Sequence, residues 1–263
     1  MTKENRQFEE FLPSSLLELS DTEVDDLSLD EQQELIELVL IESKETIKSL
    51  YYEVDQMDEK YYSLDSFYEI QAVIAEYHQI LSDLNIDDES FNKFIDQLTE
   101  KLNNKNPIYE IAQANLGQVL VHSSDITSLY NLLQTKVDKS EVCTTAGSLQ
   151  EKNDIFRPKK KSIHAGIIFD PQDATRYFSK DVGSHRSRGR RVLEDRFKQY
   201  EYNSLQKALD NKEEDKRVEA WIDTQQAKPK AILLIDPSEK DRVIDFADKY
   251  NLPVLYNSHL YEI

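Results

Sequence analysis

The spacing of apolar residues along the chain changes near residue 117. Before that point, apolar side chains recur every three or four residues, as they do on one face of an amphipathic helix. The pattern predicts helices over about residues 28–57, 65–84 and 87–102, and a fourth helix that begins at Pro107. Because the connections between them are short, these helices are expected to form a bundle.

After residue 117 the chain contains short, continuous apolar runs, which are typical of strands buried on both faces. The predicted strands lie around Glu219 and at about residues 118–121, 163–169, 231–235 and 252–256. The predicted helices cover about residues 126–134, 192–209 and 237–250. Residues 135–161 have no clear period and predict a loop, and residues 172–181 predict a helical turn.

The strongest local signals lie between residues 231 and 256. Asp236 followed by Pro237 is typical of a helix start, because proline fits the first helical position and aspartate caps it. Asn251 fits a left-handed helix end, and Pro253 prevents the helix from continuing. This part of the chain therefore predicts a strand–helix–strand unit.

Together the two patterns predict an α+β fold, with an acidic helical bundle over residues 1–115 and a mixed α/β domain over residues 116–263. The charge supports this division. The net charge is −19, and residues 1–117 hold only 8 of the 32 Lys and Arg residues but more than half of the 51 Asp and Glu residues. All five glycines lie at or after position 117. Two kinds of polypeptide are joined in one chain.

Several features bound the compartment in which the protein works. No apolar run approaches the roughly 20 residues that span a bilayer, so we expect no membrane span. The first residues lead into acidic sequence without an apolar core. A cytoplasmic protein, or one exported without a conventional signal peptide, fits this start. The single cysteine, Cys143, excludes an internal disulfide and favours a reducing compartment.

The acidic helices have three interpretations. Their charges form a solvated surface, a docking face for a basic protein partner, or a clamp on the basic half of the same chain. Nucleic acid does not suit the bundle, because acidic side chains repel phosphates. The basic segments Arg157–Lys161 and His185–Arg191 suit a phosphate backbone better, and they equally suit a solvated loop or a contact with the bundle.

The second half carries polar residues at the ends of its predicted strands. The first strand leads into His122, Ser123 and a further serine, and a later strand contains one carboxylate, Glu219. An arginine-rich loop lies between these strands. This order resembles the ADP-ribosyltransferase superfamily over at most residues 118–256. In that family a His on the first strand, a Ser or Tyr on a middle strand and a Glu on a late strand surround NAD.

The resemblance implies a role for each matching residue. His122 would contact the nicotinamide ribose, Tyr177 would lie beneath the nicotinamide, and Glu219 would be the catalytic carboxylate. For the middle position Tyr200 and Tyr202 serve equally well. Arg217 stands where the arginine-modifying branch carries Gln or Glu, so the acceptor stays open.

The cofactor implied by the resemblance is NAD. Ser123 would bind it beside His122, and arginines of the loop would pair with its pyrophosphate through forked donors. These arginines are Arg188, Arg190 and Arg191. Cleavage of the nicotinamide bond develops positive charge on the ribose, which a buried carboxylate stabilises. The function implied is an NAD-dependent transferase that modifies a macromolecule, as in a bacterial effector or toxin.

Each residue also has a structural explanation. Glu219 fits an edge-strand glutamate paired with Lys216 or Lys230, and His122 fits a strand-end histidine bonded to the backbone. The histidines lack zinc spacing, and we expect no metal site. The alternative function is a non-catalytic protein whose acidic bundle binds a basic partner. An enzyme requires His122 and Glu219 to meet in one cleft, whereas a binding protein does not.

Overall fold

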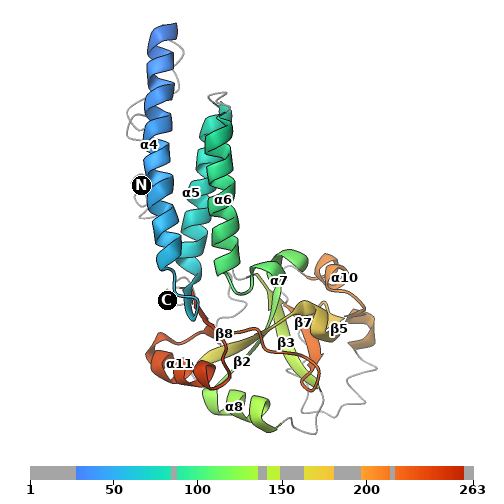
Figure 1. Ribbon diagram of the computed structural model, residues 1–263. Coiled ribbons are helices and arrows are strands. Elements are labelled where there is room, and N and C mark those ends of the chain that lie inside the picture. Colours follow the sequence, from blue (N-terminus) through green and yellow to red (C-terminus); the bar gives the residue numbers. More distant parts are fainter. Residues whose placement is uncertain are drawn as a thin grey trace. The chain divides into compact units, whose positions relative to one another are not determined.

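The fold is α+β, as the sequence predicts. The computed structural model describes residues 28–83, 88–135, 141–148, 163–180, 197–213 and 217–257. These residues form seven α-helices and a nine-stranded mixed sheet (Figure 1). The chain divides into two compact units. Residues 1–57 and 66–105 make up the first unit, and residues 58–65 and 106–263 make up the second. The predicted boundary at residues 115 and 116 therefore lies ten residues beyond the observed one, and the second unit also takes a short segment from the first half.

The described residues of the first unit form three helices, close to the bounds predicted from the sequence. They are α4 (Leu29–Gln56), α5 (Leu64–Asp83) and α6 (Glu89–Lys105). Helix α4 packs against α6. The buried side chains of α4 recur at helical spacing, as expected for a helix with one packed face, and they include Val39, Ile47, Leu50 and Val54. The buried side chains of α6 are Phe91, Ile95, Leu98 and Leu102.

Polar contacts tie α4 to α6 at two points. Lys101 Nζ lies 2.5 Å from the Asp55 carboxylate and 3.8 Å from the ring centroid of Tyr51. Near the start of α6, Lys44 Nζ lies 2.9 Å from the carboxylate of Asp88. Asp88 also caps α6, because it accepts a hydrogen bond of 3.0 Å from the backbone nitrogen of Phe91. Residue 87, where the predicted helix begins, lies outside the described residues.

The second unit is built on one sheet, with strand order β1-β9-β8-β4-β2-β3-β7-β5-β6. The strands are β1 (Tyr61–Ser63), β2 (Val119–Ser124), β3 (Glu141–Gly147), β4 (Ala165–Phe169), β5 (Ala174–Phe178), β6 (Glu201–Tyr202), β7 (Val218–Asp223), β8 (Ala231–Leu234) and β9 (Val254–Tyr256). The α-helices among the described residues of this unit are α7 (Tyr109–Ala114), α8 (Ile126–Thr135), α10 (Leu205–Asp210) and α11 (Lys240–Lys249). Strand β9 runs parallel to β1 and β8, and the other described pairs are antiparallel.

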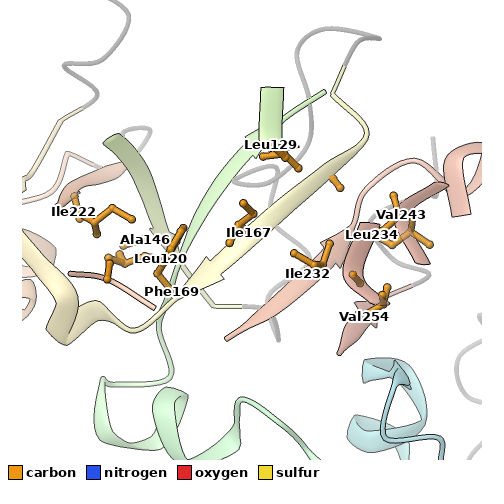
Figure 2. Close-up of a cluster of buried hydrophobic side chains, with 14 of the residues drawn as sticks. Leu120, Leu129, Ala146, Ile167, Phe169, Ile222, Ile232, Leu234, Val243 and Val254 are labelled. Atoms are coloured by element: carbon orange, nitrogen blue, oxygen red, sulfur yellow. The ribbon is translucent and has the colours of Figure 1, made fainter. Parts of the chain in front are cut away.

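The main hydrophobic core covers one face of this sheet. Figure 2 shows side chains from six of the strands gathered with Leu129 of α8 and Val243 of α11. Helices α8 and α11 also touch each other, and the ring centroids of Tyr130 and Phe246 are 4.6 Å apart. We call this the helix-covered face. It is the reference for placing the candidate site residues.

The predicted strand–helix–strand unit is present between residues 231 and 256. Strand β8 is fully buried, and Asp236 accepts a 3.0 Å hydrogen bond from the backbone nitrogen of Ser238. A short 3-10 turn, Pro237–Glu239, leads into α11. Asn251 adopts the left-handed conformation, with φ of 52°, and β9 then pairs in parallel with β8. Local sequence signals were therefore sufficient to predict this strand–helix–strand unit.

Four strands, β1, β3, β5 and β6, were not predicted. Residues 141–147, expected to be a loop, form the central strand β3, and residues 174–178 form β5 after a single 3-10 turn at Pro171–Asp173. The sheet also includes β1, which comes from the first half of the chain. Strand β3 carries Cys and Thr residues without an apolar run, and its place depends on pairing with β2 and β7. Within the predicted helix over residues 192–209, the described residues form a 3-10 turn (Lys198–Tyr200), β6 and the short α10.

Asp88 provides a test of the first unit. Its hydrogen bond with Lys44 is the largest cause that holds the pKa of the Asp88 carboxyl well below its usual value of 3.8. A carboxyl whose pKa is lowered in the folded state stabilises that state above its ordinary pKa, and the contribution is lost as the pH falls below it. We expect Asp88→Ala to lower the free energy of unfolding by about 1 kcal/mol at pH 7. The difference from wild type should shrink below about pH 4.

Thermal unfolding followed by circular dichroism at several pH values measures this effect. Asp96→Ala removes the same charge from an exposed position on α6 and is the matched control. Equal losses of stability in the two variants would contradict a capping role for Asp88.

Candidate functional site

His122 lies on β2, and its ring bonds to the backbone of the neighbouring strand. Its Nδ1 atom lies 2.8 Å from the carbonyl oxygen of Cys143. A carbonyl oxygen only accepts hydrogen bonds, so Nδ1 carries the proton. In the sheet His122 pairs with Ile167 of β4, a member of the main core. Paired residues share a face, so His122 lies on the helix-covered face, where it has the backbone partner that its structural explanation requires.

Tyr177 lies on β5 and belongs to the same core. It pairs with Ala220 of β7, and both residues are buried in the main cluster. Its hydroxyl donates a hydrogen bond to the carbonyl oxygen of Pro171, in the turn that precedes β5. Burial raises the pKa of the Tyr177 hydroxyl, and the nearby carboxylates of Asp170 and Asp173 raise it further. The hydroxyl therefore stays neutral, and it is used in a hydrogen bond to the turn just before its own strand.

Glu219 lies on β7, and only 3% of its surface is exposed. Strand β7 is an interior strand between β3 and β5, so the sequence-based alternative of an edge-strand glutamate is wrong. The indole nitrogen Nε1 of Trp221 donates a hydrogen bond of 2.6 Å to the Oε1 atom of Glu219. Residues two apart on a strand share a face, which brings these two side chains together. A buried carboxylate needs such donors, because burial without them is costly.

An aromatic cluster surrounds this pair. Its buried members are Phe178, Phe197 and Trp221, and the rings of Phe178 and Trp221 are 5.7 Å apart. The guanidinium of Arg176 lies 5.4 Å from the Trp221 ring, and its Nη2 atom donates to both carboxylate oxygens of Glu141 at 3.2 Å. The cluster holds Trp221 on two sides, and this orders the donor that Glu219 uses.

The sheet register places the predicted catalytic residues on different faces. Val121, Thr145, Glu219 and Phe178 pair in turn across β2, β3, β7 and β5, so they share one face. His122 follows Val121 and therefore points to the opposite face. The separate core clusters agree, because Tyr177 belongs to the main core and Phe178 belongs to the aromatic cluster.

The expectation that His122, Tyr177 and Glu219 line one cleft is therefore not met. His122 and Tyr177 lie on the helix-covered face, whereas Glu219 lies on the other. By the same alternation Ser123, the predicted cofactor-binding neighbour of His122, shares the face of Glu219. The order of these residues along the chain does not reveal their faces, since a shift of one residue along a strand reverses the face.

The remaining predicted contacts fall outside the described residues. These are the pyrophosphate-binding residues Arg188, Arg190 and Arg191, and the basic segments Arg157–Lys161 and His185–Arg191. Nucleic-acid binding through these segments stays a prediction. Within the described ranges, no group of three or more His, Cys, Asp or Glu side chains is arranged to hold a metal ion. None of the described helices combines the length and apolar character needed to cross a membrane.

A feature that the sequence analysis missed lies on α4. Leu38, Ile41 and Tyr52 are large apolar side chains with 46%, 57% and 66% of their surface exposed. A surface helix normally carries polar residues opposite its packed face. The signal was present in the sequence as a second apolar spacing along the same helix, beside the spacing of the buried residues.

Comparisons with models of protein families, with curated proteins and with solved structures found no match to this chain.

The bond between Trp221 and Glu219 provides a test of the aromatic cluster. We expect Trp221→Phe to lower the free energy of unfolding by about 1–3 kcal/mol, because it removes a hydrogen-bond donor from a buried carboxylate. Replacing both partners, with Glu219→Met beside Trp221→Phe, should recover part of the loss. Denaturant unfolding at pH 7 measures both variants. A single variant as stable as wild type would show that the indole bond contributes nothing.

The arrangement of the faces also gives an expectation for NAD. We expect the purified protein, added to a cell lysate with NAD, to release no more nicotinamide than the lysate alone does, and Glu219→Gln to behave like wild type. Chromatographic assay of nicotinamide in the presence of cell lysate measures this. Release by the wild type and not by Glu219→Gln would show that Glu219 takes part in NAD chemistry despite its separation from His122.

Proposed function

We propose that this protein acts by binding another protein, and that its partner is a basic amphipathic helix that docks on α4. The observation that carries the proposal is the apolar stripe on the exposed side of that helix. We call this surface the outer α4 face. Its apolar members are Leu38, Ile41 and Tyr52, and its exposed acidic members are Glu34, Glu37 and Glu45.

The three apolar side chains lie along one side of α4, and the exposed residues Glu34 and Glu45 lie on the same side. With about 100° of rotation per residue, Leu38, Ile41 and Tyr52 fall within an arc of about 60°. The buried residues Val39, Ile47, Leu50 and Val54 fall on the opposite side of the helix. From Leu38 to Tyr52 the stripe runs about 21 Å, or roughly four turns, which matches the length of a typical partner helix.

Burial of this stripe supplies a driving force. Full burial of a Leu or Ile side chain contributes about 1.5–3 kcal/mol, and about half the surface of each is still exposed here. Single exposed apolar residues are ordinary on a protein surface. Three on one helix face, out of four exposed large hydrophobic residues among those described, are typical of a docking surface for an amphipathic helix.

Charge determines which helix fits. Glu34, Glu37 and Glu45 are exposed around the stripe. Lys48 is the only base along this side of α4, because Lys44, the other lysine of the helix, is paired with Asp88 of α6. A partner with Lys or Arg beside its apolar residues would pair with these carboxylates and associate faster. An acidic partner would be repelled.

The NAD-dependent transferase, in an exported effector or toxin, is the weaker hypothesis. Its support is the order of residues along the chain, and the separation of His122 from Glu219 removes the shared cleft that it requires. Burial of Glu219 against Trp221 explains that carboxylate without catalysis. Among the described residues of the first unit, none covers the exposed apolar side chains of the outer α4 face.

A defined peptide tests the docking proposal. We expect a fluorescent helical peptide of leucine and lysine, about 18 residues long, to bind the full chain with a change in anisotropy. Leu38→Ser with Ile41→Ser should weaken this binding by about tenfold or more, because two buried side chains are lost. Glu34→Gln with Glu45→Gln should weaken it mainly at low salt, since screening already removes surface attraction at high salt.

Two controls accompany this measurement. Leu116→Ser removes an apolar side chain of similar exposure, 56%, from the second unit and should leave the affinity unchanged. A leucine–glutamate peptide of the same length should not bind. Equal affinity for the two peptides, or an equal loss in Leu116→Ser and the α4 variant, would overturn the proposal.

A further inference from the structure

A cavity of about 390 Å³ lies in the second unit, apart from the residues discussed above. Its apolar wall comes from Leu132 and Leu133 of α8, from Phe169 at the end of β4, and from Tyr250 and Leu252 after α11. The opposite wall is the loop from Thr224 to Pro229, which joins β7 to β8. The volume lies at the lower end of the range for small-molecule pockets, about 300–1,000 Å³.

The loop wall is held in place by Asp223. One carboxylate oxygen accepts from the backbone nitrogen of Gln225 at 2.9 Å, and the other accepts from the side chain of Gln226 at 3.1 Å. The backbone carbonyl of Asp223 also accepts from the nitrogen of Ala227 at 2.8 Å. The loop is therefore ordered by its own bonds. A preordered wall reduces the entropy that a ligand would otherwise lose on binding.

The other wall is equally fixed. The Tyr250 ring packs against Phe246 at 5.3 Å and against Tyr130 at 6.2 Å. The chain then turns at the left-handed Asn251, and the backbone nitrogen of Leu252 donates to the carbonyl of Ala247 at 3.0 Å. These contacts hold the apolar wall in place, as the bonds of Asp223 hold the loop.

The lining selects the chemistry of the ligand. Leu132, Leu133 and Phe169 offer an apolar surface for a flat body, and Lys228 is the only charged side chain among the lining residues. Both carboxylate oxygens of nearby Asp223 are already used by the loop. No lining side chain carries a negative charge that would pair with a cation, and a polyphosphate would find a single lysine. A monoanion with an apolar ring system fits both features.

We propose that this cavity binds a small aromatic monoanion, such as a carboxylate or sulfonate, with its rings against the apolar wall and its charge toward Lys228. The site does not depend on the outer α4 face, which lies in the other unit. Its ligand chemistry is also the reverse of the basic partner expected there, so one proposal can fail without the other.

Anilinonaphthalene sulfonate is the probe for this site, because it joins aromatic rings to one anionic group. We expect the full chain to enhance its fluorescence with saturation at one equivalent. Lys228→Glu should weaken its binding by about tenfold or more, through loss of the attraction and added repulsion. Lys207→Glu makes the same charge change at an exposed position on α10 outside the cavity, and its affinity should stay within about twofold of wild type.

A neutral analogue, phenylnaphthylamine, separates the two contributions. It should bind the wild type more weakly than the sulfonate does, and Lys228→Glu should not affect it. Lys228 is exposed, and circular dichroism will establish that both lysine variants keep the wild-type fold. Equal sulfonate affinity in Lys228→Glu and wild type, or binding of many equivalents, would overturn the proposal, since the latter indicates general apolar exposure.

Discussion

The alternation of side chains along the strands is the constraint on which the second unit depends. On one face of the sheet, the strands contribute side chains to the main core beneath α8 and α11. On the other face they contribute residues such as Glu219 and Trp221. Neighbouring residues of one strand therefore serve different environments, as His122 and Ser123 do on β2. A set of residues can form a site on this sheet only if its members share a face. The pairing register of β2, β3 and β7 determines which residues share a face, and residue identity does not.

The parts of the fold that the sequence predicted are those with local causes. Pro237 and Asn251 set the ends of a helix through their own backbone preferences, and the apolar run from Ala231 needs no partner to be recognised. Strands β3 and β5 have no such signal. Thr144 is buried because its hydroxyl bonds to the carbonyl of Ala220 on β7, a residue far along the chain. Such long-range pairing overrides local propensity, and a single sequence does not reveal it.

The candidate site, like the fold, could be predicted from the sequence only where the cause is local. Spacing alone could have paired Glu219 with Trp221, because residues two apart on a strand share a face. Spacing could also have shown the second apolar stripe of α4. The relation of His122 to Glu219 was not accessible, since it depends on the register of β3 between their strands. Order along the chain therefore did not show which residues share a face, whereas periodicity within one element shows which of its side chains lie together.

The two proposed surfaces favour ligands of opposite charge, although the chain has one large net charge. The short range of electrostatic forces in salt solution explains how both ligands could bind. A net charge of −19 attracts a basic helix and repels an anion when both are remote. At physiological salt this field fades over about 8 Å, so a ligand inside the cavity is affected mainly by the groups that line it. There the nearest charge is Lys228. Raising salt should therefore weaken binding at the outer α4 face far more than binding in the cavity, where apolar contact provides most of the affinity. This difference would identify which surface a newly found partner occupies.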